Sequence, residues 1–336
     1  PPPPPPLFQA EDGIRDTSHC LVGSEMFIRD RAGGALSKLE LSTAEAGCEL
    51  FTDIAWFGHE SPERVLLIVS GVHGVEGFAG SAVQLATLNC LPSLTDDTSL
   101  VMIHALNPYG MANLRRFNGN NVDLNRNFHF SNDGWQGEPE GYTELDNFFN
   151  PARPPSFDFF YLKAILAWLR FGNAYVRQAA TGGQYHYPKG LCFGGNGLEP
   201  EAAGYIAWLQ GSSLLNVDKL MVLDFHTGLG RFGKQSLFLR ASPGRREELS
   251  CKLGVAVTPS KTESKTMGYH HGGGSSGVYR RLFNGSELTC LTVEYGTYNG
   301  FRMLHALRAE NQYHHYGDQD LDHWSKQNLK EAFCPG

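Results

Sequence analysis

The chain has 336 residues, of which 41% are hydrophobic and 19% charged, and its formal net charge at pH 7 is −7. This composition is ordinary for a globular protein, and the length is enough for one large domain with a full core. An acidic chain without a basic run is a poor candidate for nucleic-acid binding, and no apolar run reaches the roughly 18 residues that a membrane-spanning helix needs. We therefore expect neither nucleic acid nor a membrane as a partner.

The chain has seven cysteines, and their spacing bears on whether the protein works in a reducing or an oxidising compartment. Their spacing matches neither a metal cluster nor a dense disulfide framework. Such usage is typical of a reducing environment, so we expect a cytoplasmic protein. One of them, Cys20, lies in an N-terminal segment that does not resemble part of a domain.

That segment covers residues 1–31 and opens with six prolines. It resembles a translated sequencing adapter, and we predict that it is a non-native, disordered artefact. A real polyproline arm and linker is the alternative. The domain is then expected to span residues 32–336, and the natural N-terminus, with any signal peptide, would lie outside this sequence.

Short apolar runs alternate with segments of helical periodicity through the rest of the chain. Strands are predicted near residues 51–57, 65–70, 99–106, 219–225, 236–240 and 288–294, and helices near 76–90, 158–180, 199–214 and 302–333. This alternation predicts a single α/β domain in which helices cover both faces of a sheet. Residues 129–157 are rich in Gly, Asn, Pro and aromatic residues and are expected to form a long functional loop.

His73 and Glu76 are separated by two residues and follow the apolar strand 65–69. A histidine and an acid at this spacing can bind one metal ion, and ligands of open α/β sheets bind at the carboxyl ends of the strands. The pattern H-x-x-E is nevertheless common by chance. A catalytic zinc site needs three protein ligands and one open position, so the pair predicts a metal site only together with a third ligand.

His226 is the obvious third candidate, because it also ends an apolar strand and is followed by Thr227 and Gly228. A buried histidine with an ordinary hydrogen bond is the alternative for either histidine alone. Two strand-end histidines together favour a shared metal ion. Asp224 lies two residues before His226 and can accept a hydrogen bond from its second ring nitrogen.

Five segments, taken in order, carry a resemblance to a known family: H-x-x-E at 73–76, N-P-Y-G at 107–110, D-L-N-R-N-F at 123–128, D-F-H-T-G at 224–228 and T-V-E-Y-G at 292–296. They resemble the zinc carboxypeptidases, the carboxypeptidase A-like metallopeptidases. The match is closest to a bacterial-type branch beside the aspartoacylase and succinylglutamate desuccinylase deacylases. The resemblance implies a three-layer α/β/α fold with a mixed, largely parallel central sheet, and one zinc hydrolase domain over residues 32–336.

The same resemblance implies a metal centre and its chemistry. His73, Glu76 and His226 would bind one Zn²⁺ per chain. Glu294, which follows the apolar strand 288–293, would be the general base and then the general acid. Such a carboxylate can take a proton from a zinc-activated water and return it to the leaving nitrogen. An ordinary strand-end acid is the alternative for Glu294.

The D-L-N-R-N-F segment supplies the remaining implied roles. Asn125 and Arg126 match the positions that hold a substrate carboxylate, for which the planar fork of an arginine is well suited. Asp123 matches the acid that accepts a hydrogen bond from the first histidine ligand. Such an acid fixes the ring without binding the metal itself.

Two further assignments stay open. Either Arg115 or Arg116 can stabilise the oxyanion that forms on the scissile carbonyl, and we prefer Arg116 because it lies nearer to the D-L-N-R-N-F segment. The other arginine is then expected to be a solvated surface charge. The tyrosine that closes over substrate in the carboxypeptidases has three possible equivalents, which are Tyr269, Tyr279 and Tyr298.

Residues 273–277 formally match G-x-S-x-G, the nucleophile elbow of serine hydrolases. That motif should follow a buried strand, whereas the preceding residues 267–272 are polar and rich in glycine. We predict instead a loop that leads into a helix over 278–283, with Ser275 or Ser276 near its N-cap.

The combined expectation is a zinc-dependent hydrolase that cleaves an amide bond next to a free carboxylate, on a peptide or a small molecule. A metallocarboxypeptidase is the leading form of this hypothesis, and an N-acyl amino acid deacylase of the aspartoacylase type is its alternative. A non-catalytic protein that binds peptides or acidic metabolites is an alternative of another class. The sequence does not determine the oligomeric state.

Overall fold

The computed structural model describes residues 34–40, 50–91, 93–131, 134–260, 273–318 and 320–336. Residues 1–31, for which we predict a non-native artefact, lie outside the described residues. So does Tyr269, one of the three candidates for a substrate-closing tyrosine.

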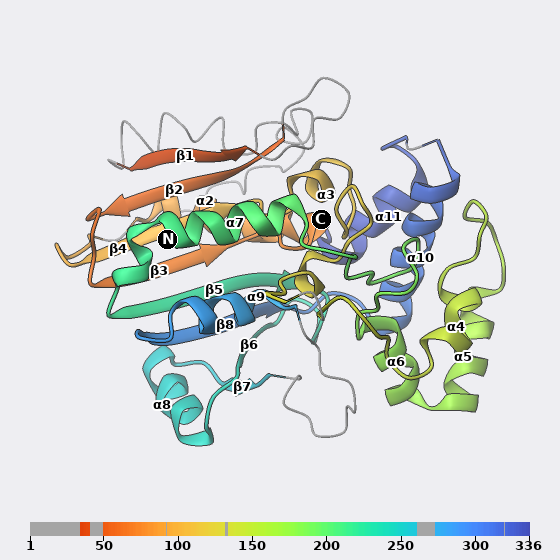
Figure 1. The fold of residues 1–336 in the computed structure, drawn as a ribbon. Helices are drawn as coiled ribbons and strands as arrows, with labels where there is room; N and C mark the ends of the chain where they lie inside the picture. The colour runs from red at the N-terminus through yellow and green to blue at the C-terminus, as the bar shows by residue number, and fades with distance from the viewer. Residues whose placement is uncertain (1–33, 41–49, 92, 132–133, 261–272, 319) are drawn as a thin grey trace, which may run out of the picture.

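One eight-stranded sheet runs through the described part of the chain in the order β1-β2-β4-β3-β5-β8-β6-β7 (Figure 1). The strands are β1 Ala35–Glu40, β2 Phe51–Gly58, β3 Arg64–Val69, β4 Thr98–His104, β5 Lys219–Thr227, β6 Gln235–Leu239, β7 Val257–Pro259 and β8 Glu287–Tyr295. The four central strands β4, β3, β5 and β8 are parallel, and antiparallel pairs join β1 to β2, β2 to β4 and β6 to β8. The prediction of a mixed, largely parallel sheet is therefore confirmed.

Helices cover both faces of this sheet. The α-helices are α2 Gly77–Asn89, α3 Pro108–Ala112, α4 Tyr142–Phe149, α5 Phe160–Phe171, α6 Asn173–Thr181, α7 Pro200–Gly211, α8 Pro243–Leu253, α9 Ser275–Leu282, α10 Gly300–Tyr316 and α11 Trp324–Phe333, and the 3-10 turns are η2 Gly74–Glu76, η3 Leu124–Arg126 and η5 Ser213–Asn216. Within the described ranges, no helix has both the length and the apolar character to cross a bilayer.

The alternation of side chains along β3 explains the three layers. Leu67 and Val69 point to one face, where they join a core cluster that α7 and α9 cover. Ile68 points to the other face and packs in a second cluster with residues of α2 and α8. Successive residues of a strand point to opposite faces, so a continuous apolar run requires cover on both sides. Figure 1 shows α7 crossing one face and α2 behind the other.

Two predicted helices are each interrupted. The segment predicted as one helix over 158–180 is split into α5 and α6 at Gly172, whose φ of +83° is incompatible with a continuous right-handed helix. The segment predicted over 302–333 is split into α10 and α11, because Gly317 has an extended backbone. The expected loop over 129–157 contains α4, whose Tyr142, Leu145 and Phe149 are buried on one side of the helix.

His104 ends β4 and is buried, with its Nδ1 atom 3.2 Å from Ser70 Oγ and 3.1 Å from Gln84 Oε1. Burial lowers the pKa of His104 to about 4, because the charged ring would lose its hydration. The unfolded chain binds this proton at a pKa near 6.5, so the stability that His104 contributes is complete above that pH and is lost as the pH falls toward 4.

We predict that lowering the pH from about 6.5 to about 4 removes about 3 kcal/mol more unfolding free energy from the wild type than from His104→Gln. The variant has no titrating ring at this position. Denaturant unfolding of both proteins at a series of pH values measures the difference. A difference in unfolding free energy between the two proteins that does not change with pH would contradict the lowered pKa of His104.

Candidate metal centre

The parallel register brings three strand ends to one edge of the sheet. Val69 at the end of β3 pairs with Asp224 of β5, and His226 of β5 pairs with Glu294 of β8. The chain leaves β3, reaches His73 and then forms η2, so that Glu76 lies immediately before α2. Residues from three separate segments therefore meet where ligands of open α/β sheets bind.

The segment that follows α3 is fixed against η2. The backbone N–H of Gly74 donates to the carbonyl of Arg116 at 3.1 Å, and the N–H of Val75 donates to that of Arg115 at 2.8 Å. A Cβ atom at Gly74 would collide with the backbone of Gly110 in α3, so this close approach requires glycine. The backbone pairing places Arg116 beside Glu76.

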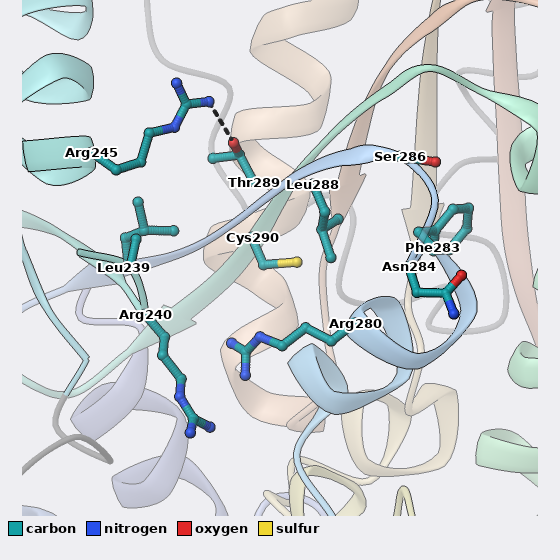
Figure 2. A pocket seen from close by; sticks show the side chains of 11 residues that line it. Leu239, Arg240, Arg245, Arg280, Phe283, Asn284, Ser286, Leu288, Thr289 and Cys290 are labelled. Carbon is teal, nitrogen blue, oxygen red and sulfur yellow. Dashed lines mark hydrogen bonds between the residues drawn. The ribbon is translucent and has the colours of Figure 1, made fainter.

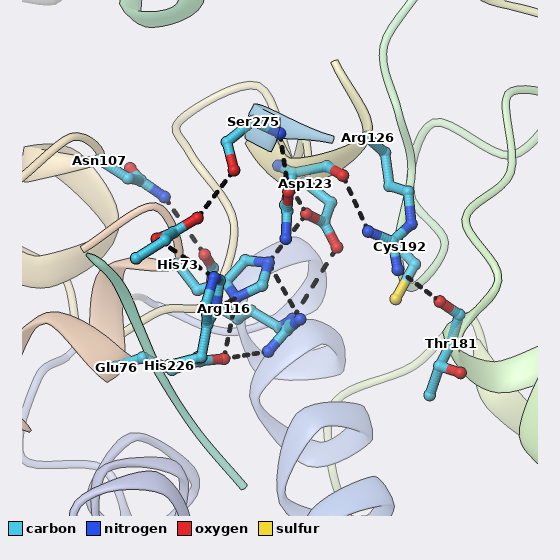
Figure 3. Close-up of polar contacts among 12 residues, drawn as sticks. His73, Glu76, Asn107, Arg116, Asp123, Arg126, Thr181, Cys192, His226 and Ser275 are labelled. Atoms are coloured by element: carbon cyan, nitrogen blue, oxygen red, sulfur yellow. Dashed lines mark hydrogen bonds and ion pairs between the residues drawn. The ribbon is translucent and has the colours of Figure 1, made fainter. Parts of the chain in front are cut away.

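Three candidate ligands converge on one point (Figure 3). His73 Nδ1 lies 3.0 Å from Glu76 Oε1, His226 Nδ1 lies 3.2 Å from Glu76 Oε2, and the two Nδ1 atoms are 3.3 Å apart. Zinc–ligand bonds of about 2.0–2.1 Å in a tetrahedron place the donor atoms about 3.3 Å from one another. The observed spacing and the donor set of two imidazoles and one carboxylate fit zinc.

The second nitrogen of each histidine faces a carboxylate. His73 Nε2 lies 3.0 Å from Asp123 Oδ1, and His226 Nε2 lies 3.2 Å from Asp224 Oδ1. A carboxylate at Nε2 holds the proton on that atom, which leaves the lone pair of Nδ1 directed at the shared point. Both rings are therefore oriented as metal ligands require.

The charge balance of the cluster also favours a cation. Glu76, Asp123, Asp224 and Glu294 are buried together, with Arg116 beside them. Burial raises the pKa of Glu76, but His73 and Arg116 outweigh this effect and hold that pKa well below its usual range. For His226, burial lowers the pKa, but the carboxylates of Asp224 and Glu76 raise it well above the ordinary value. A divalent cation would supply the positive charge that these carboxylates otherwise draw from a proton on His226.

The two arginines of the doublet have different environments. Arg116 lies at the cluster: its Nη1 atom donates to Glu76, and its Nη2 atom is 3.0 Å from His73 Nε2. Arg115 points away and donates from Nε to Glu310 Oε1 of α10 at 2.9 Å. Arg115 is fully buried, so the expectation that the second arginine is a solvated surface charge is wrong.

Glu294 lies beside the ligands on the neighbouring strand. Its side chain is buried, and Oε1 accepts a hydrogen bond from the backbone N–H of Leu229 at 2.9 Å. Burial raises the pKa of Glu294, and the charge of Glu76 adds to this rise, while His226 opposes it. A carboxyl group whose pKa is raised toward neutrality is suited to accept and return a proton.

Asn125 and Arg126 lie in the short turn η3, whose N-cap is Asp123. The Asp123 side chain accepts from the backbone N–H of Asn125 at 3.0 Å, so the acid that holds His73 also fixes this turn. The Arg126 guanidinium is directed away from His73 and donates to the carbonyls of Asn125 and Thr181, each at 2.8 Å (Figure 3). Among the described residues these bonds use two of its five N–H donors.

Ser275 also belongs to this network, a role that its position in the G-x-S-x-G pattern and near a helix N-cap does not indicate. Its hydroxyl donates to Asp224 Oδ2 at 2.7 Å, and its backbone N–H donates to Asn125 Oδ1 at 3.1 Å. Ser275 is the first residue of α9, and the two described residues just before it, 273–274, have irregular backbone. Its bond to a carboxylate supports Asp224, which in turn contacts His226.

The two described tyrosine candidates have partners in the protein. Tyr279 is buried in the core, with its hydroxyl 2.8 Å from that of Tyr205. Tyr298 donates to Glu331 Oε1 at 2.6 Å. Because a core residue cannot move over a substrate, the environment of Tyr279 does not suit that role.

A cavity of about 460 Å³ lies apart from this cluster (Figure 2). Its lining includes Arg240, Arg245 and Arg280, Ser286 just before β8, and residues 288–290 at the start of that strand. Glu294 lies near the opposite end of that strand. The cavity is therefore distinct from the candidate metal centre.

The comparisons with known proteins agree with the fold. A family profile described as "Protein of unknown function (DUF2817)" matches residues 30–336, and no curated protein matches the sequence. Carboxypeptidase A from Helicoverpa armigera is similar at a TM-score of 0.50 and 11% identity, over 96% of this chain and 80% of that one. This likeness confirms the carboxypeptidase-like fold that the sequence motifs implied.

Two other solved structures are similar at lower TM-scores. Murein-tripeptide amidase MpaA from Escherichia coli O157 has a TM-score of 0.43 and 17% identity, over 85% of this chain and 94% of that one. Bovine thrombin-activatable fibrinolysis inhibitor, in complex with tick carboxypeptidase inhibitor, has a TM-score of 0.49 and 13% identity, over 94% of each chain.

We predict that Asp224→Asn weakens zinc binding about 10- to 100-fold, because the carboxylate that orients His226 is lost. Competition with a chromogenic chelator measures the affinity. Asp218→Asn, just before the same strand, is the matched control and should bind zinc as the wild type does. If the wild type, Asp224→Asn and Asp218→Asn bind zinc with equal affinity, Asp224 does not support the metal centre.

Proposed function

This chain belongs to the DUF2817 family and has the carboxypeptidase A fold, and we propose that it is a zinc-dependent hydrolase that cleaves an amide bond next to a free carboxylate. A metallocarboxypeptidase is the simplest form of this proposal. The observation that carries it is the convergence of His73 Nδ1, His226 Nδ1 and the Glu76 carboxylate, with Glu294 on the adjacent strand.

Zinc held by these three residues would supply a Lewis acid that activates water and polarises the scissile carbonyl. Glu294 is the proposed acceptor of the proton from water, as the water oxygen attacks the carbonyl carbon. The same carboxyl group then returns the proton to the nitrogen as the carbon–nitrogen bond breaks. Its burial, its raised pKa and its fixed hydrogen bond to Leu229 N–H all support this role.

Arg116 is the proposed electrostatic partner of the reacting carbonyl. Its side chain is 15% exposed, whereas that of Glu76 is 1% exposed, so Arg116 is the more accessible member of this pair. A fixed cation at this position stabilises the negative charge that develops on the carbonyl oxygen.

Asn125 and Arg126 are proposed to bind the substrate carboxylate. The carbonyls of Asn125 and Thr181 hold the guanidinium of Arg126 in one orientation. An ordered fork with unused N–H donors loses little entropy when it binds a carboxylate at two points.

We predict that Glu294→Gln retains zinc but lowers kcat by at least about 100-fold, because an amide cannot accept the proton. Hydrolysis of peptides with a free C-terminus and of N-acyl amino acids measures turnover, and metal analysis measures zinc. Glu287→Gln, at the other end of β8, is the matched control and should keep wild-type turnover. Activity that survives in Glu294→Gln would refute the assignment.

We predict that Arg126→Ala raises KM about 10- to 100-fold for a substrate with a free carboxylate, since a charge-assisted pair is lost. The C-terminal amide of the same substrate should be affected little. Arg177→Ala, on the neighbouring helix α6, serves as the control. If Arg126→Ala raises KM by the same factor for both substrates, Arg126 does not recognise the carboxylate.

A further inference from the structure

Helix α5 is apolar on nearly all sides, although it lies on the surface. Its inward face, formed by Phe160, Ala164 and Ala167, is buried. Its outward face is also apolar, and the two charged residues of the helix, Lys163 and Arg170, occupy one edge between the two faces. A surface helix of a globular protein normally has a polar outer face, and a helix that is apolar all round is normally buried.

The outward face continues into the segment just before the helix. Phe157 is 85% exposed, Leu166 is 56% exposed and Leu169 is 69% exposed. The apolar residues that form this surface, which we call the α5 face, are Phe157, Phe159, Tyr161, Leu162, Ile165, Leu166, Trp168 and Leu169. Figure 1 shows α5 at the outer edge of the molecule, far from the central sheet.

The size of the α5 face exceeds what a monomer usually exposes. Fully exposed large apolar side chains present about 150–250 Å² each, so these eight together expose on the order of 900 Å². The largest apolar patch of a typical monomer is about 300–600 Å². A stable protein–protein interface of standard size buries about 800 Å² on each partner. The α5 face alone meets that requirement.

We propose that the α5 face packs against the α5 face of a second copy of this chain, across a two-fold axis near the centre of the helix. An apolar helical face is complementary to itself, because residues on either side of the axis meet their counterparts in the other copy. The centre of the face carries no charge, which is typical of the buried core of homodimer interfaces. Lys163 and Arg170 lie at its edge, where they remain hydrated.

A membrane surface is the competing occupant, and the charges oppose it. Helices that lie on membranes combine an apolar face with a polar face rich in Lys and Arg. The opposite face of α5 is instead packed in the protein, and the chain carries a net charge of −7, which anionic lipids repel.

The oligomeric state of the full-length chain tests the proposal. Sedimentation velocity and light scattering should give a mass of about twice 37.1 kDa for the wild type at micromolar concentration. Ile165→Glu should weaken the dimer about 100-fold or more, because it buries a carboxylate in each copy and has only apolar and aromatic neighbours three and four residues away. Its circular dichroism and zinc binding should be those of the wild type, which distinguishes loss of the dimer from unfolding.

A matched control and a mixing experiment sharpen the test. Leu253→Glu changes an aliphatic side chain of similar exposure, at the end of α8, and should remain dimeric. Ile165→Lys should be monomeric alone and should form a heterodimer with Ile165→Glu in an equimolar mixture, since the two-fold axis brings position 165 close to itself. A monomeric wild type, a dimeric Ile165→Glu, a mixture that stays monomeric, or wild-type binding to anionic lipid vesicles would each overturn the proposal.

Discussion

The parallel register of β3, β5 and β8 is the constraint on which the candidate metal centre depends. Because β3 pairs with β5 in register, the loop after Val69 and the end of β5 reach the same edge of the sheet. The β5–β8 pair then places His226 and Glu294 directly side by side. A slip of one residue in either pairing would turn these side chains to the opposite face of the sheet. The apolar runs that fix the register are buried on both faces, so the core of the sheet maintains the geometry of the site.

The buried carboxylates of the candidate metal centre also constrain the structure, through the partners that they require. A cluster of buried carboxylates is costly unless each has a hydrogen bond and a compensating positive charge. Asp224 accepts a hydrogen bond from Ser275, and its other oxygen lies 3.2 Å from His226 Nε2. Ser275 also binds Asn125, so the first turn of α9 connects the proposed carboxylate-binding turn to one candidate metal ligand. Displacement of this turn would therefore disturb both parts of the site together.

The sequence predicted the parts of the structure that depend on local pattern. The observed bounds of β3 and β8 lie within one residue of those predicted, because continuous apolar runs mark buried strands. The edge strands β1 and β7 were not predicted, since the first contains charged residues and the second has three residues. The choice between Arg115 and Arg116 depends on backbone bonds to η2, and the Ser275–Asp224 contact joins residues 51 positions apart. Tertiary packing determines such contacts, so no local pattern predicts them.

The most direct test is the metal content of the purified full-length chain, measured by mass spectrometry after incubation with zinc and removal of the excess. The account predicts one zinc per chain in the wild type and none in His226→Ala, since two ligands do not retain the ion through chelator washing. A matched substitution outside the candidate ligands, His186→Ala, should keep the metal, because that side chain is exposed and pairs with Glu138 instead. A folded wild type that binds no zinc would contradict the metal centre and the proposed hydrolase.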